Sequence, residues 1–196
     1  MYSRRMVSSS EPRVERMAAH KKILLGITGS IAAYKSCDII ISLRKLGCEV
    51  KVAMSPDSKH FITPLTLQTL SSNEVVTDMF ERPAKWDIAH ISLAEWADLI
   101  LIAPASADMI SKLACGLADC ILSATVLSSR TKVLIAPAMN EKMYKHKAVQ
   151  ENIAKLKRFG YKFVGPKHGR LACGYEGMGH IADVKDIVQA VEKAIR

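Results

Sequence analysis

The sequence lacks the long apolar run that a membrane-spanning helix requires, because no stretch approaches about 18 consecutive apolar residues. Residues 1–20 also lack the apolar segment of a secretion signal, and Glu11 and Glu15 argue against a transit peptide. We therefore expect no membrane partner. We expect residues 1–20 to be a disordered leader and residues 21–196 to form one domain, which is long enough to bury a proper core.

Cysteine occurs at five positions, but without CxxC pairs and without metal-like spacing to histidine. The odd number and the spacing argue against a disulfide framework and against a zinc site. The sequence thus predicts a cytoplasmic protein with reduced thiols and no metal. Cys37, Cys48, Cys115 and Cys120 fall in expected helices or at a strand start and are interpreted as packing residues, which leaves Cys173 as a candidate for chemistry.

Aromatic residues are scarce, at 6% of the chain, and are not interleaved with the basic residues. The net charge of +9 arises between residues 130 and 170, where eleven Lys or Arg face two Glu. Without the stacking residues that single-stranded nucleic acids require, and with Lys155, Lys157 and Arg158 expected on the solvated side of a helix, we predict no nucleic-acid partner. A solvated face and attraction of anionic substrates both stay open as explanations.

Short apolar runs alternate with segments of helical periodicity along the rest of the chain. Strands are expected at Lys22–Thr28, Glu49–Met54, Leu99–Ala103, Lys132–Ala136 and Tyr161–Val164, and helices at Ile31–Leu46, Asp108–Leu127 with an interruption at Gly116, Lys147–Phe159 and Val184–Ile195. This alternation predicts the α/β class: a doubly wound, flavodoxin-like or Rossmann-like parallel sheet with helices on both faces.

Ligands of such sheets bind beyond the carboxyl ends of the strands, and small polar residues follow several of these strands here. The first turn carries Gly29 and Ser30 but does not match GxGxxG, and the second strand ends at Met54-Ser55 rather than at an acidic residue that would hold a dinucleotide ribose. NAD is therefore not expected, and neither is a Walker A loop. The turn and the hydroxyls of Ser30, Ser55 and Ser58 suit a mononucleotide phosphate, with a tight turn capped by Ser30 as the alternative.

Small residues also follow the strand at Leu99–Ala103, where Ala105, Ser106 and Asp108 precede a helix. Small side chains allow a flat ring to approach the backbone. Ser106 and Asp108 are suited either to accepting ligand N–H groups or only to capping the helix.

An amide, an imidazole and a thiol complete the candidate chemistry. Asn140 ends the segment Ala136–Asn140 after a strand, His90 is expected on a surface loop, and Cys173 lies in a glycine-rich stretch, residues 165–179, that is expected to be a lid without regular structure. An imidazole near pH 7 suits removal of a thiol proton. Asn140 is suited to capping the next helix or to donating to a carboxylate, and Met143 to completing that pocket or to filling the core.

The segments GITGSIAAYK, FITPLTLQTL, HISLAEWADLILIAPASADMISKLACGLADCIL, PAMNEKM and LACGYEGMG, in this order, closely resemble the homo-oligomeric flavin-containing cysteine decarboxylases. The resemblance covers about residues 21–196, which it implies to be a flavin-binding decarboxylase domain. Its specific part is PAMN with a downstream ACG. Two positions depart from the family pattern, because Tyr175 stands where Asp is frequent and His180 where Arg is frequent.

The resemblance implies FMN as the cofactor. It implies cofactor contacts from Gly29, Ser30, Ile31, Ser55, Phe61, Ala105, Ser106 and Met139, catalytic roles for His90, Asn140 and Cys173, and substrate contacts from Asn140, Met143 and Ala172. FMN would provide the electron sink that an N-acyl cysteine lacks, through thioaldehyde and enethiolate intermediates of the substrate. It further implies a homotrimer or an assembly of trimers, with His90 facing FMN bound largely by another chain.

The substrate implied by Ala138 and Cys173 is phosphopantothenoylcysteine, converted to phosphopantetheine in coenzyme A biosynthesis. Relatives that act on peptidyl cysteines in natural-product maturation remain the alternative, as does a non-catalytic flavin-binding regulatory subunit. The regulatory subunits carry acidic tails, which this chain lacks. Bifunctional relatives have a ligase domain after the decarboxylase, so the ligase step is expected on another polypeptide.

Overall fold

The computed structural model describes residues 20–80 and 88–196. The predicted leader, apart from His20, and the residues Trp86 and Asp87 ahead of His90 lie outside the described residues. Within these ranges, no helix is both long enough and apolar enough to cross a membrane.

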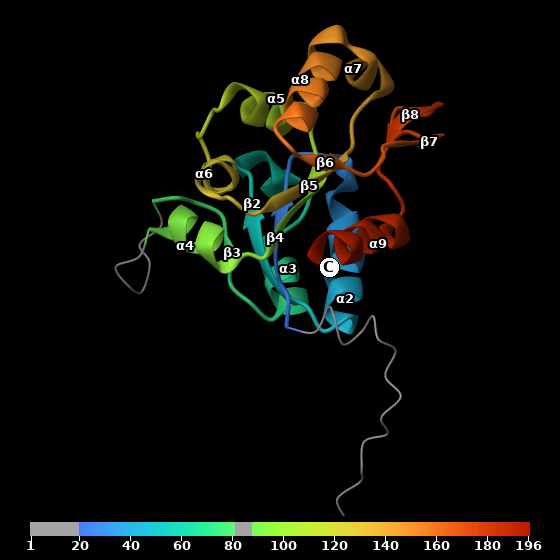
Figure 1. The fold of residues 1–196 in the computed structure, drawn as a ribbon. Coiled ribbons are helices and arrows are strands. Elements are labelled where there is room, and N and C mark those ends of the chain that lie inside the picture. Colours follow the sequence, from blue (N-terminus) through green and yellow to red (C-terminus); the bar gives the residue numbers. More distant parts are fainter. Residues whose placement is uncertain (1–19, 81–87) are drawn as a thin grey trace, which may run out of the picture.

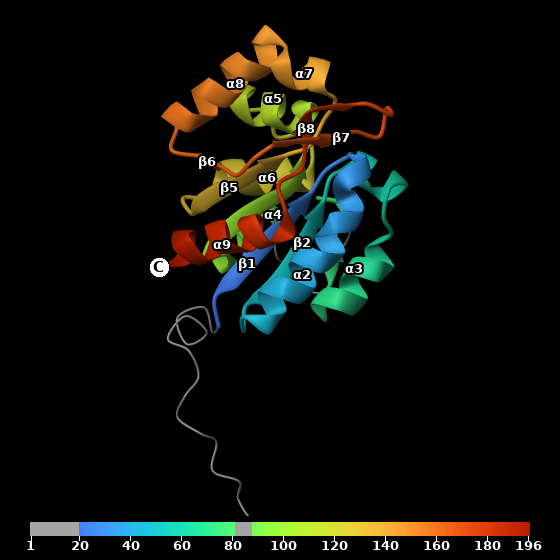
Figure 2. The same cartoon turned by 90° about the vertical axis from the view of Figure 1, so that its right-hand side faces the viewer.

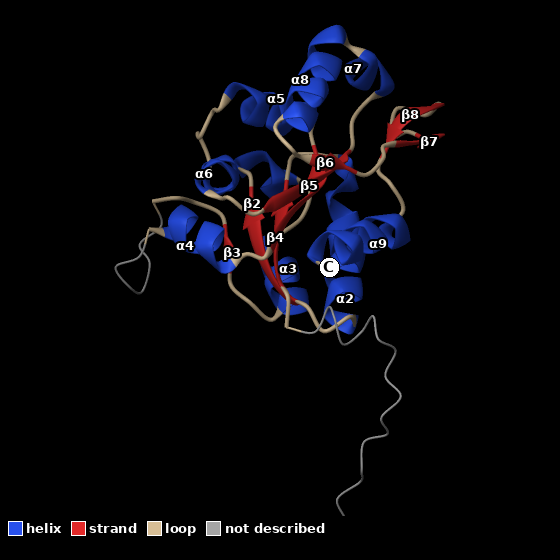
Figure 3. Ribbon diagram, in the orientation of Figure 1, coloured by secondary structure: helices blue, strands red, loops and turns tan. Residues whose placement is uncertain are grey.

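A six-stranded sheet forms the centre of the molecule, and its strands run parallel in the order β3-β2-β1-β4-β5-β6 (Figures 1 and 3). The strands are β1 (Lys22–Ile27), β2 (Glu49–Met54), β3 (Val75–Val76), β4 (Leu99–Ala105), β5 (Lys132–Pro137) and β6 (Lys162–Phe163). Along the chain, β2 and β3 are added on one side of β1, and β4, β5 and β6 are added on its other side. This change of side between β1 and β4 defines a doubly wound sheet. The fold class predicted from the alternating pattern is confirmed.

Helices cover both faces of the sheet (Figure 2). One face carries α2 (Lys35–Lys45), α3 (Pro64–Ser71) and α9 (Val184–Ile195), and the other carries α4 (Ala89–Trp96), α5 (Ala107–Cys115), α6 (Ile121–Ser128) and α8 (Lys147–Arg158). Three short helical segments are η1 (Ile31–Tyr34), η2 (Pro56–His60) and α7 (Glu141–Lys145). Each face therefore buries its own apolar cluster.

The central strands consist almost entirely of buried apolar residues. On β1, Leu25 faces one cluster and Leu24 faces the other, because successive side chains of a strand point to opposite faces. A parallel strand covered on both sides needs apolar residues at every position, which explains the continuous apolar runs in the sequence.

Several expected elements differ in the structure. The helix expected over Ile31–Leu46 is divided into η1 and α2. The helix expected over Asp108–Leu127 is divided into α5 and α6, because Gly116 ends α5 in the left-handed region at φ 71° and the next helix begins at Ile121. The expectation of no regular structure for residues 165–179 was wrong, since β7 (Lys167–Arg170) and β8 (Glu176–His180) form an antiparallel hairpin. This hairpin stands apart from the main sheet, beside α7 (Figures 1 and 2).

The end of β4 departs from regular pairing with β5, because the register shifts between Ile102 and Ala105. Pro104 lies within this shift and has no N–H to donate. Two buried hydroxyls pair the carbonyls at this point: Ser36 Oγ donates to Ala103 O at 3.0 Å and Thr28 Oγ1 donates to Pro104 O at 2.8 Å. The Thr28 oxygen also accepts the N–H of Ser106 at 2.8 Å. Thr28 therefore joins the end of β1 to the start of α5.

Replacing Thr28 with Val should destabilise the protein by about 2–3 kcal/mol, since the change leaves a buried carbonyl and a part-buried N–H without their partner. Thr125→Val is the matched control. Thr125 is equally buried, but its hydroxyl donates at 2.7 Å to Ile121 O, a carbonyl that also belongs to the hydrogen-bond ladder of α6. The free energy of unfolding in urea measures both changes, and equal losses would contradict the bridging role of Thr28.

Candidate active site

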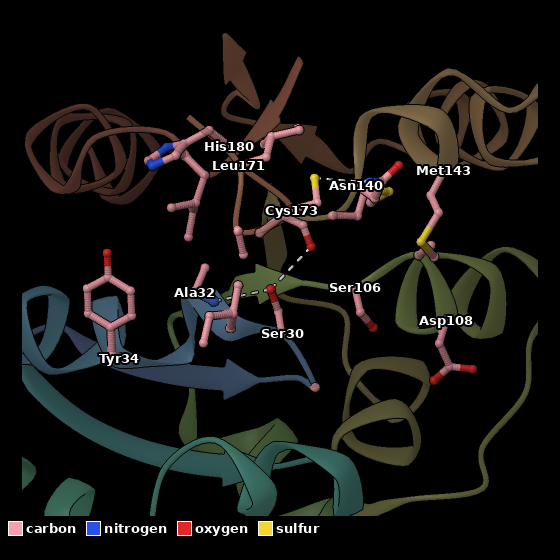
Figure 4. Close-up of a pocket in the computed structure, with 18 of the residues that line it drawn as sticks. Ser30, Ala32, Tyr34, Ser106, Asp108, Asn140, Met143, Leu171, Cys173 and His180 are labelled. Atoms are coloured by element: carbon pink, nitrogen blue, oxygen red, sulfur yellow. Dashed lines mark hydrogen bonds between the residues drawn. The ribbon is translucent and has the colours of Figure 1, made fainter. Parts of the chain in front are cut away.

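A cavity of about 780 Å³ opens at the carboxyl ends of β1 and β4, where the strand order reverses (Figure 4). Ligands of doubly wound sheets bind at this position. The cavity is lined by small and apolar residues together with hydroxyl, amide and thiol groups, among them Ser30, Ser106, Asn140, Met143 and Cys173. Its volume falls in the range of about 300–1,000 Å³ that is typical of cofactor and small-molecule sites.

Ser30 lies at the floor of the cavity, directly after β1. Its hydroxyl accepts the N–H of Ala32 at 3.3 Å and donates to Ala138 O at 3.4 Å, so Ser30 caps η1 and also touches the segment after β5. Gly29 beside it has no space for a side chain, because a Cβ there would lie 2.7 Å from Cβ of Asp57. The tight turn that Ser30 caps therefore also forms the floor of the cavity.

Of the three serines expected to share one phosphate, one lines the cavity, and the other two are buried and contact each other. Ser58 is fully buried and its hydroxyl donates to Ser55 O at 2.6 Å, so it is not available to a ligand. Ser55 is also buried and does not line the cavity. Of these hydroxyls, the cavity receives that of Ser30.

Ser106 caps α5, because its hydroxyl accepts the N–H of Met109 at 3.2 Å. It also lines the cavity, as does Asp108, whose carboxylate pairs with Lys112 at 3.0 Å. The capping interpretation therefore holds for Ser106, while the side chain still borders the space where a ligand would lie.

Asn140 combines both of the roles that the sequence left open. Its Oδ1 accepts the N–H of Lys142 at 2.8 Å and caps α7. Its Nδ2 points to the hairpin and lies 3.5 Å from Sγ of Cys173 (Figure 4). The same nitrogen lies 3.1 Å from the hydroxyl of Tyr175. The amide and the thiol predicted from distant motifs are therefore neighbours.

The β7–β8 hairpin carries Cys173 in its turn and is fastened to the start of α7. The N–H of Met178 donates to Glu141 Oε1 at 3.1 Å, and the N–H of Met139 donates to Gly179 O at 3.1 Å. Lys145 pairs with Glu141 at 2.7 Å, and this ion pair, followed by the Met178 N–H, holds the pKa of the Glu141 carboxyl below its ordinary value. Glu141 thus accepts the hairpin backbone as a carboxylate.

His90 is the second residue of α4, so the expectation of a surface loop was wrong. The helix forms because Leu93 and Ala94 supply a buried face against α6. His90 does not line the cavity of its own chain, and neither do Phe61 or the buried Ala105. Their roles remain predictions.

Several lining residues were not expected from the sequence. Tyr34, which is half exposed, and His180 face one end of the cavity (Figure 4). His180 stands out in the sequence only as a departure from the family pattern, and the resemblance assigns no role to Tyr34. The position of Tyr34 one helical turn after Ser30 is a signal that would have placed it at the same edge.

The sequence profile described as Flavoprotein matches residues 11–196. The chain therefore belongs to the flavoprotein family.

Within that family, the chain is 48% identical over 177 residues to the probable phosphopantothenoylcysteine decarboxylase of Streptococcus mutans, with 89% of this chain and 99% of that protein covered. It is 46% identical over 177 residues to the coenzyme A biosynthesis bifunctional protein CoaBC of Bacillus subtilis. That match covers 90% of this chain but 44% of the bifunctional protein, so the chain spans less than half of that relative.

A crystal structure of the FMN-dependent cysteine decarboxylase SpaF is also similar. It superposes with a TM-score of 0.80 at 30% identity and covers 91% of this chain and 97% of that one.

Substituting Gly179 by Ala should undock the hairpin, because Gly179 has φ 140° and a Cβ there would lie 2.2 Å from the carbonyl oxygen of Met139. Gly160→Ala is the control. Gly160 also has a positive φ, of 93°, but nothing lies within 4 Å of its Cβ position. The control should lose roughly 1 kcal/mol of stability from backbone strain alone.

Hydrogen exchange of the β8 amides distinguishes the two variants, with faster exchange expected in Gly179→Ala and not in Gly160→Ala. Unchanged protection of β8 in Gly179→Ala would contradict the proposed docking.

Proposed function

We propose that this chain is an FMN-dependent phosphopantothenoylcysteine decarboxylase of coenzyme A biosynthesis. The observation that carries the proposal is the approach of the Asn140 amide and the Cys173 thiol, at 3.5 Å, above a cavity at the switch point of the sheet. The relative from Streptococcus mutans, which matches over 99% of its length, carries the same activity in its name.

The residues of the cavity fit FMN. Gly29, Ala32 and Ala138 leave space for a flat ring beside the backbone, and Ile31 and Met139 add apolar surface. The hydroxyls of Ser30 and Ser106 border the same space at the ends of β1 and β4 and are suited to the polar tail of the cofactor. When bound, FMN supplies a reversible two-electron acceptor, without which CO2 loss from an N-acyl cysteine would leave an unstabilised carbanion.

The side chains of the hairpin and of α7 would handle the substrate. Asn140 presents its NH2 group to the cavity because its oxygen is engaged as a helix cap, so it is suited to binding the substrate carboxylate. Met143 is half exposed at the cavity wall and would cover the acyl chain. Cys173 would donate the proton that the enethiolate carbon needs after CO2 has left.

His90 would act on the substrate thiol from a neighbouring subunit. In this chain His90 is absent from the cavity lining, and its sequence neighbours Ile88 and Ile91 are apolar and exposed, at 63% and 37%. Such a group marks a protein interface. A homotrimer, or an assembly of trimers, would bury these side chains and bring His90 to the cavity of the next subunit.

The cytoplasm is the proposed location. The part of the chain that the structure describes forms no disulfide, and a mechanism in which the Cys173 thiol gives up its proton requires a reducing compartment.

CO2 release tests the proposal directly. The protein, which should be yellow when purified, is incubated with phosphopantothenoylcysteine and, separately, with a peptide that ends in cysteine. We expect release from the first compound. Release from the peptide alone would favour a peptidyl-cysteine decarboxylase, and a colourless protein that binds no added FMN would exclude the whole proposal.

Cys173→Ser should keep its flavin and bind substrate but should release CO2 for about one turnover, because the proton donor acts only after decarboxylation. Reduced flavin and an enethiol product should accumulate, as followed by absorbance. Wild-type turnover in this variant would remove Cys173 as the donor.

Mixed oligomers test the shared site. His90→Asn and Asn140→Asp, each inactive alone, are co-expressed with different tags and purified through both. In a cyclic trimer that contains both variants, about one interface in three joins an intact His90 to an intact Asn140, so about a third of the activity should return. Mixed assemblies without activity would mean that His90 serves the cavity of its own chain.

A further inference from the structure

The helix cap fixes the oxygen end of the Asn140 amide but not its nitrogen end. Its Oδ1 accepts the N–H of Lys142 at 2.8 Å, and a flipped amide would place two donors against each other there. The NH2 group must therefore face the hairpin. The direction of its two hydrogens is set by the groups that accept them, and not by the cap.

Two groups of the hairpin turn receive these hydrogens. Nδ2 lies 3.1 Å from the hydroxyl of Tyr175 and 3.5 Å from Sγ of Cys173. The two contacts differ in strength, since oxygen is the better acceptor and sulfur a weak one. A carboxylate that enters the cavity beside Cys173 can replace the contact to sulfur, whereas the contact to Tyr175 lies at the rim and persists, because Tyr175 itself does not line the cavity.

The backbone of the turn fixes the position of Tyr175. The N–H of Leu171 donates to Tyr175 O at 2.8 Å, and the N–H of Gly174 donates to Leu171 O at 3.0 Å. The phenol therefore moves with Cys173 and with the rest of the hairpin. The hydroxyl oxygen of Tyr175 accepts a hydrogen from Asn140, and its own hydrogen is free to point away from this contact. The part of the chain that the structure describes places no other hydrogen-bond partner on this hydroxyl.

We infer that Tyr175 is a positioning residue, whose hydroxyl holds the Asn140 amide in the direction that recognises the carboxylate of the substrate. The inference rests on the proposed function, because it assigns the carboxylate-binding group of that reaction. Through this contact, recognition of the carboxylate depends on a docked hairpin, so the amide and the thiol are brought to the substrate as one unit.

The test compares two ligands that differ only in the carboxyl group. Phosphopantothenoylserine has a hydroxyl in place of the reactive thiol and is not consumed, and the corresponding ethanolamide lacks the carboxylate. Calorimetry on the protein as purified gives the Kd of each. Tyr175→Phe should weaken binding of the serine compound about three- to tenfold, the usual effect of one hydrogen bond, and leave the Kd of the ethanolamide unchanged.

A double-mutant cycle separates positioning from general structural support. In an Asn140→Ala background, Tyr175→Phe should have no further effect on the Kd of the serine compound, because the group that it positions is absent. Tyr161→Phe, which removes a hydroxyl outside the cavity lining, should change neither Kd. The midpoint of thermal unfolding shows that each variant is folded.

Four results would overturn the inference: equal weakening of both ligands, unchanged or tighter binding of the serine compound, additive effects in the double variant, or no binding of the serine compound to the unmodified protein. CO2 release by the unmodified protein is measured alongside. If the unmodified protein releases CO2 from phosphopantothenoylcysteine and any of these results is found, the inference fails while the proposed function stands. If CO2 is not released, the proposed function itself fails.

Discussion

The fold around the cavity depends on the hydrogen bonds made at the end of β4. Proline at 104 removes one backbone donor at the point where the register with β5 shifts, so two carbonyls in a fully buried region need partners from elsewhere. The hydroxyls of Thr28 and Ser36 meet this need. Because Thr28 also receives the N–H of Ser106, the same bridge sets where α5 begins. The bridge thus joins the segments after β1 and β4, whose residues Gly29, Ser30 and Ser106 line the cavity.

A second constraint acts on the opposite wall of the cavity. Within the described residues, the β7–β8 hairpin pairs with no strand of the main sheet. Its backbone is held by the N–H of Met139, which donates to Gly179 O, and by the Glu141 carboxylate, which accepts the N–H of Met178. Glycine at 179 permits the close approach, since any side chain there would meet a carbonyl oxygen. The thiol and the amide therefore meet through backbone docking rather than through apolar packing. This arrangement suits a site in which the turn must admit and release a ligand.

The sequence predicted best the elements whose apolar residues follow a regular pattern. The expected strand at Glu49–Met54 and the expected helix at Val184–Ile195 have the bounds found in the structure, and β1 differs by one residue. The two strands are apolar at most positions and the helix carries its apolar residues at helical spacing, so the pattern alone suffices. The hairpin was missed because its exposed strands contain small and charged residues, and its pairing depends on a partner surface that no local pattern encodes.

The same difference between local pattern and docking explains which site residues could be predicted from the sequence. Ser30, Ser106 and Asn140 follow neighbouring parallel strands, whose carboxyl ends must lie at one edge of the sheet, so topology alone brings them together. The contact from Asn140 to Tyr175 could not be predicted in this way, because it requires the hairpin to dock in one register on α7. His90 gains no place in the cavity from the folded chain, since α4 is packed against α6 and lies outside the cavity lining. Residues placed by strand topology can be predicted from one sequence, whereas contacts made by docking require the folded chain.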